Sequence, residues 1–246
     1  MKYTFSSLLS ALAMARRFQI VRWAPRLLQV GLLVALWPVH TYAQDATLTL
    51  YDGVNPIITV VDNGPGDLIP TIGAILVQTN VGVWNLAIST AVTKPLLGST
   101  TSPVMDLDIQ ANSTAAGSLQ LVFSDNNFGP ASGLLTATVT GHVVAGAGVT
   151  DTYTVFGDPH NVIGATTIPI ASTGTSPLPI AASDSGPLGL PTPFSLTEVE
   201  TMVASGPTTL TTDASYQVIP EPSVIGLAVL GFAALTLGWP RRSRSC

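Results

Sequence analysis

Hydrophobic and polar residues alternate through most of the chain between residues 44 and 219. Segments such as 105–111 (MDLDIQA) and 118–124 (SLQLVFS) place an apolar residue at every second position, which is typical of β-strands with one buried face. The predicted strands are 47–51, 57–61, 71–79, 83–90, 105–111, 118–124, 134–144, 152–157, 166–171, 194–204 and 210–219. Many short strands separated by Gly, Pro, Asn and Asp predict an all-β fold, a single antiparallel β-sandwich of jelly-roll-like type.

Two segments within this region are less regular. Residues 172–193 contain five prolines and three glycines, so we expect a long surface loop of the sandwich rather than a linker to a second domain. Residues 194–204 (FSLTEVETMVA) could form a short helix by the spacing of their glutamates. We expect a strand there, because the neighbouring segments are strands.

The longest apolar runs lie outside the alternating region. Residues 27–39 form a 13-residue apolar run that follows several arginines and precedes Thr41-Tyr42-Ala43. Basic residues, a short apolar run and small residues before the cut are typical of a signal peptide, so we expect signal peptidase to cleave residues 1–43 after Ala43. An uncleaved anchor is the alternative, and Met14 is a possible true start.

The second apolar run, residues 223–239, contains 17 uncharged residues. As a helix it would be about 26 Å long, close to the thickness of a bilayer core. The basic tail 240–246 follows, and its Arg241, Arg242 and Arg244 should stay in the cytoplasm. This orientation places the β-rich region, the ectodomain, outside the inner membrane.

Pro220-Glu221-Pro222 stands directly before this predicted transmembrane helix. Prolines lack an N–H group and favour extended backbone, so the triplet would present an unpaired stretch at the membrane surface. Triplet, short apolar helix and terminal arginines together resemble the PEP-CTERM sorting signal of Gram-negative bacteria, here residues 220–246. The resemblance implies transient anchoring, processing by an exosortase-type membrane protease, and release to the cell surface or extracellular matrix.

Charge is distributed as unevenly as hydrophobicity. Thirteen of the fourteen acidic residues lie between Asp45 and Asp213, where Lys94 is the single basic residue, so this region has a net charge of −12. Such a region would be repelled by phosphates, which excludes a nucleic-acid partner. The single cysteine, Cys246, leaves the sandwich without an internal disulfide and rules out a Cys2His2 zinc site.

Few residues suggest catalysis. The ectodomain contains two histidines, His142 within a strand and His160 in a predicted turn, and it lacks the Gly-x-Ser-x-Gly motif of many hydrolases. Glu198 and Glu200 would share one face of a strand, whereas glycosidase carboxylates face each other across a sugar cleft. We therefore expect no enzyme and no required cofactor, with a hydrolase as a distant alternative.

The best candidate for a metal site is the segment DNGPGD, residues 62–67. Asp62, Asn63 and Asp67 offer oxygen atoms, and the glycines allow the tight backbone that a Ca²⁺ ion needs. The alternative is a hairpin turn that begins at Asn63-Gly64. Weaker candidates for metal binding are Asp106, Asp108, Asp125, Asn126 and Asn127.

These observations favour an exported, non-catalytic surface or matrix protein associated with exopolysaccharide, with divalent cations bridging the acidic domain to acidic polymer. The alternative is a carbohydrate-binding or adhesive module, which usually needs exposed aromatic rings. The aromatic candidates are Tyr51, Tyr153, Tyr216, Phe128 and Phe156, whereas Trp84 lies in an apolar strand and should be in the core. Ice binding is more distant, because the threonines follow no fixed repeat.

Overall fold

The computed structural model describes residues 46–220, and every regular element in this range is a β-strand. Sheet A contains, in spatial order, β2 (Ile58–Val61), β1 (Thr47–Tyr51), β6 (Gly117–Phe128), β11 (Phe194–Ala204), β8 (Val149–Asp158) and β9 (Ile168–Pro177). Sheet B contains β10 (Ile180–Leu188), β7 (Gly133–Gly146), β12 (Thr208–Pro220), β5 (Val104–Ser113), β4 (Trp84–Val92) and β3 (Ala74–Val81).

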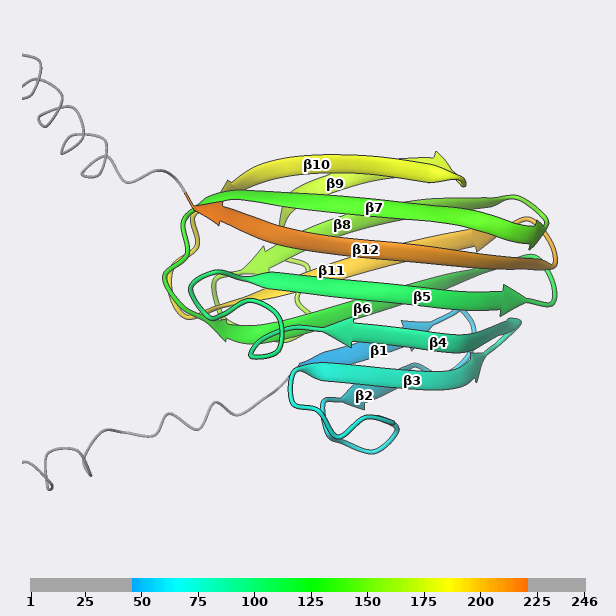
Figure 1. The fold of residues 1–246 in the computed structure, drawn as a ribbon, viewed down its shortest axis with the longest axis horizontal. Coiled ribbons are helices and arrows are strands. Elements are labelled where there is room, and N and C mark those ends of the chain that lie inside the picture. The colour runs from blue at the N-terminus through cyan, green and yellow to red at the C-terminus, as the bar shows by residue number, and fades with distance from the viewer. Residues whose placement is uncertain (1–45, 221–246) are drawn as a thin grey trace, which may run out of the picture. The chain divides into compact units, whose positions relative to one another are not determined.

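Neighbouring strands are antiparallel in both sheets, and the sheets stack face to face (Figure 1). The all-β, two-sheet prediction is therefore confirmed. The expected signal helix, with its cleavage site at Ala43, lies outside the described residues. So do the transmembrane helix, Glu221, Pro222 and the arginine cluster. None of the described elements is a helix that could cross a bilayer.

The core fills the space between the sheets, as the alternating sequence predicts. On β5, for example, Met105, Leu107 and Ile109 point inward and are buried. Trp84 is only 1% exposed, and its indole N–H donates a hydrogen bond to the carbonyl oxygen of Ser118 at 2.8 Å. This bond satisfies the polar atom of the largest core side chain, which confirms the expected core position.

The prediction of a surface loop over residues 172–193 is wrong for most of this segment. It contains the second half of β9 and all of β10. Proline misled the prediction because it normally interrupts a sheet, but an edge strand tolerates it. Both β9 and β10 are edge strands, and Pro187 of β10 lies opposite Leu134.

The same two strands close one side of the sandwich. A Cβ atom at Gly186 on β10 would collide with the backbone carbonyl oxygen of Ile170 on β9, so glycine allows the edges of the two sheets to approach. The segment 194–204, in contrast, is the predicted strand. It forms β11 in the middle of sheet A, paired with both β6 and β8.

Candidate functional site

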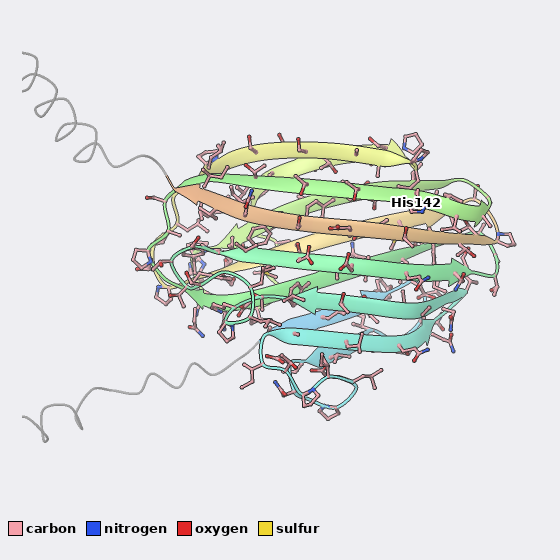
Figure 2. The ribbon with its side chains drawn as sticks, viewed as in Figure 1. His142 is labelled. Carbon is pink, nitrogen blue, oxygen red and sulfur yellow. The ribbon has the colours of Figure 1, made fainter. Side chains whose placement is uncertain are left out.

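The outward face of sheet B carries a dense group of polar side chains. Asp213 on β12 lies between Asp108 of β5 and Thr140 of β7, and the next outward residue, Thr211, lies between Gln110 and His142. The alternation that buries the apolar residues of these strands points the polar ones to solvent. Figure 2 shows His142 on β7, in the sheet nearer the viewer.

These side chains line a groove of about 580 Å³. Its lining residues come from four adjacent strands: Asp108, Ile109, Gln110, Thr140, Gly141, His142, Ile180, Thr211, Thr212 and Asp213. The Thr211 hydroxyl lies 3.2 Å from Nδ1 of His142, within hydrogen-bonding distance. Carboxylate, amide, imidazole and hydroxyl groups together offer the donors and acceptors that a polyhydroxylated ligand requires.

A second hollow of about 170 Å³ lies on the same face and is lined by Val104, Thr136, Thr138, Ser215, Tyr216 and Gln217. Residues 211–213 of β12 line the groove and residues 215–217 line the second hollow. The two depressions therefore follow each other along one strand, as an extended ligand would require.

Three carboxyl groups make this face acidic. Asp106 and Asp108 lie on β5 and Asp213 lies on the paired strand β12, directly opposite Asp108. Burial, with smaller contributions from the other two carboxylates, raises the pKa of Asp106 to about 6. Burial and the charge of Asp213 also raise the pKa of Asp108. The face therefore favours ligands that are neutral or cationic.

The segment DNGPGD forms a turn whose carboxylates bond to the backbone. Asp62 accepts hydrogen bonds from the Gly73 N–H at 2.8 Å and from the Asn63 side-chain amide at 2.8 Å. Asp67 accepts from the N–H groups of Asn63, Ile69 and Leu76 at 2.9–3.0 Å. The expected turn is present, but it joins strands of different sheets, so it is not a hairpin.

The proposed calcium ligands are thus brought together, with Asn63 directing its amide N–H group to Asp62. Between residues 46 and 220, no three acidic, histidine or cysteine side chains are grouped as a metal site requires. Calcium binding at Asp62, Asn63 and Asp67 stays a prediction. A calorimetric titration with Ca²⁺ tests it, and absence of both heat and thermal stabilisation would contradict it.

The single lysine of this region has a structural role. Lys94 lies 2.7 Å from both carboxylate oxygens of Asp125 and 2.6 Å from the Asn126 carbonyl oxygen. The Thr93 hydroxyl also donates to Asp125 at 2.7 Å, and the ammonium group lies 4.4 Å from the ring centre of Phe128. These contacts tie the connection after β4 to the end of β6.

The remaining sequence candidates do not converge on a site. His160 is exposed and lies in the predicted turn after β8, where Asp158 accepts the N–H groups of His160 and Val162. The aromatic candidates form no exposed platform. Tyr153, Tyr216 and Phe128 are buried, and the half-buried Tyr51 and Phe156 lie on β1 and β8, which are not adjacent.

Glu198 and Glu200 share one face of β11 as expected, but that face points into the core. Both side chains are 0% exposed, and so is Asp151 on the paired strand β8. We call Asp151, Glu198 and Glu200 the acid cluster. The pair cannot face a sugar across a cleft from this position. Sequence reasoning missed Asp151 and the Tyr153 hydroxyl, which donates a hydrogen bond to Glu198 at 2.6 Å.

No protein-family model matches the chain, and no curated protein matches it. Among solved structures, it is similar to a carbohydrate-binding module of the β-sandwich superfamily, with TM-score 0.31, 12% identity, and coverage of 70% of this chain and 72% of that one. The enzymatically active domain of bacteriophage CBA120 tailspike protein 4 gives TM-score 0.29 and 15% identity over 65% of this chain, which spans about a fifth (21%) of that one.

A third structure, the module TmCBM61 in complex with β-1,4-galactotriose, gives TM-score 0.26 and 8% identity, covering 56% of this chain and 88% of that one. Similarities of this size do not extend to shared ligands or activities. The β-sandwich architecture is established by the strand pairing itself.

Proposed function

We propose that the domain is a non-catalytic binding module that takes a neutral saccharide in the groove on the outward face of sheet B. The observation that carries this proposal is the groove itself, in which Gln110, Thr140, His142 and Thr211 offer hydrogen bonds beside two carboxylates. No aromatic side chain lines the groove, so affinity there would come from hydrogen bonds rather than from stacking. Each such bond adds only about 0.5–1.5 kcal/mol net, so we expect weak binding to single sugars and stronger retention on polymers.

Affinity electrophoresis of the purified full chain tests this function, in gels that contain neutral or acidic polysaccharides. We expect retardation by at least one neutral polymer, and we expect Thr211→Ala and His142→Ala to reduce it. Thr152→Ala is the matched control, because Thr152 is an outward threonine of sheet A with its own cross-strand hydroxyl partner, Thr175. Equal retardation of the groove variants and wild type would contradict the proposal.

We further propose that the module is exported and sorted through the PEP-CTERM-like segment 220–246. The sequence supports this reading through the Pro220-Glu221-Pro222 triplet, the apolar run and the arginines. Retention on acidic exopolysaccharide through divalent cations would then follow from the net charge of −12. Replacing the triplet with alanines should block release from the membrane, and a chelator wash should release the retained protein. Unchanged release by the alanine variant would contradict sorting, and retention through the chelator wash would contradict cation bridging.

A further inference from the structure

The acid cluster lies in the core without the partners that buried carboxyl groups normally have. Of its six carboxyl oxygens, the one with a hydrogen-bond partner within residues 46–220 belongs to Glu198 and accepts from Tyr153. The other five, on Asp151, Glu198 and Glu200, have no partner with good hydrogen-bond geometry. The Thr152 N–H near Asp151 and the Thr212 hydroxyl near Glu200 lower the pKa of these two groups, but burial is the larger influence on both. Burying an ionised carboxylate without a partner is so costly that the group normally takes up a proton instead.

The surrounding strands offer no compensating positive charge. Lys94, the one lysine or arginine between residues 46 and 220, is bound to Asp125. From sheet B, β12 contributes the buried hydroxyls of Thr212 and Tyr216, which also have no partner among the described residues. Among the acids of sheet B, Asp106 and Asp213 act on Glu198, and Asp213 also acts on Glu200.

We propose that the acid cluster is a proton-binding site that couples folding to pH, because the folded domain keeps protons on its interior carboxyls that the unfolded chain releases. A protonated carboxyl is both donor and acceptor, which suits a core that contains hydroxyls but no cation. This site is distinct from the groove and does not depend on the groove binding a saccharide.

The direction of each pKa agrees with this geometry. Burial raises the pKa of Glu198 and of Glu200 well above the ordinary value, and the charge of Asp151 raises that of Glu200 further. Burial also raises the pKa of Asp151 to about 6. The two tyrosines near the acid cluster stay neutral, since burial raises the pKa of Tyr153 and of Tyr216 as well.

The sign of the pH dependence follows from these directions. In the unfolded chain the three carboxyls ionise near pH 4, whereas in the folded domain they keep their protons to higher pH. The stabilising contribution is therefore complete below pH 4 and is lost as the pH rises through the folded pKa values. Between about pH 4 and the pKa values of the folded domain, the unfolding equilibrium constant should rise about tenfold per pH unit for each proton that the folded domain retains.

Urea unfolding of the full chain between pH 4.5 and 8.5 tests the proposal. We expect the midpoint to fall steadily with rising pH, and the double variant Glu198→Gln/Glu200→Gln to flatten the profile. Asp184→Asn is the control, because Asp184 is exposed on the edge strand β10 and is not among the groups that raise the pKa of Glu198 or Glu200. It should keep most of the slope. A flat wild-type profile, or equal slopes in wild type and double variant, would overturn the proposal.

Infrared spectroscopy provides a second measurement if the double variant does not fold. The wild-type domain at pH 7 should show the C=O band of a protonated carboxyl that is protected from exchange, and unfolding in urea should remove it. Absence of this band in the folded protein would overturn the proposal.

Discussion

Sheet A and sheet B are built from the same strand-forming residues, but their acidic side chains lie on opposite faces. In sheet A, Glu198 and Glu200 on β11 and Asp151 on β8 point inward and are fully buried. In the central strands of sheet B, Asp106, Asp108 and Asp213 point outward, and the inward positions are uncharged. Successive side chains of a β-strand point to opposite faces of the sheet. Whether an acidic residue is buried or exposed therefore depends on whether it occupies an odd or an even position along the strand.

The outward face of sheet A shows the opposite character. Its outward strand positions, among the described residues, carry hydroxyls, amides, aliphatic groups and the half-buried rings of Tyr51 and Phe156. Cross-strand hydroxyl pairs such as Thr49–Thr59 and Thr154–Ser172 connect neighbouring strands. The acid on that side, Asp158 at the end of β8, is buried and accepts hydrogen bonds from the following loop. The sandwich thus has one neutral face, one acidic face, and acids between them.

The largest effect should come from placing an acid on the inward face of sheet B. Ala214→Asp on β12 would bury a fourth carboxylate in the core without a partner, and we expect a loss of about 4 kcal/mol or more in the free energy of unfolding. Its neighbour Asp213 points outward, so Asp213→Ala should change stability by about 0.5 kcal/mol or less. Urea unfolding at pH 7 measures both, and similar losses would contradict the opposite orientation of the two positions.

The second-largest effect concerns Asp125, a buried acid that is paired with a cation, unlike the acid cluster. Lys94→Met removes the ammonium group from the buried Asp125, and breaking such a pair costs about 3–5 kcal/mol at pH 7. Urea unfolding at pH 7 measures this loss. A loss of about 1 kcal/mol or less would contradict a stabilising ion pair and leave the packing of Lys94 against Phe128 as its main contribution.

A smaller effect comes from the two tyrosine hydroxyls between the sheets. Tyr153→Phe removes the hydrogen bond to Glu198 and should cost about 1–3 kcal/mol, since the carboxyl loses its remaining partner. Tyr216→Phe is the matched control from sheet B, because its hydroxyl has no partner within the described chain, and we expect a neutral or stabilising change. Thermal unfolding at pH 5 compares the two variants. An equal loss of stability in both would contradict the different bonding of the two hydroxyls.

Much of this arrangement could be predicted from sequence. Of the twelve strands between residues 46 and 220, the alternating segments predicted ten. The strand β11 was predicted correctly from its strand neighbours, although its glutamates suggested a helix. The missed strand, β10, is an edge strand whose sequence IAASDSGPL shows no alternating pattern and contains a proline. Edge position depends on how distant segments pair, so local sequence does not reveal it.

The candidate sites divide in the same way. Glu198 and Glu200 share sequence parity with Phe194, Leu196 and Met202, so the alternation could have shown that they face the core. The groove could not have been found by this route. It combines β5, β7, β10 and β12, and their order in the sheet differs from their order in the chain.

The smallest expected effect concerns the acidic face of sheet B itself. Asp213→Asn removes one of the two carboxylates that raise the pKa of Asp106. We expect this pKa to move down from about 6 but to stay above the ordinary value, because burial is the larger cause and the substitution leaves it unchanged. Side-chain carboxyl NMR titration measures the shift, with Asp184→Asn as the control, since Asp184 lies at the β10 edge and bonds to Ser172. A return of Asp106 to the ordinary value would show that repulsion between carboxylates, rather than burial, dominates this face. In that case the face would bind cations more readily than neutral sugars. The proposal of cation bridging would then be better supported than the proposal of saccharide binding.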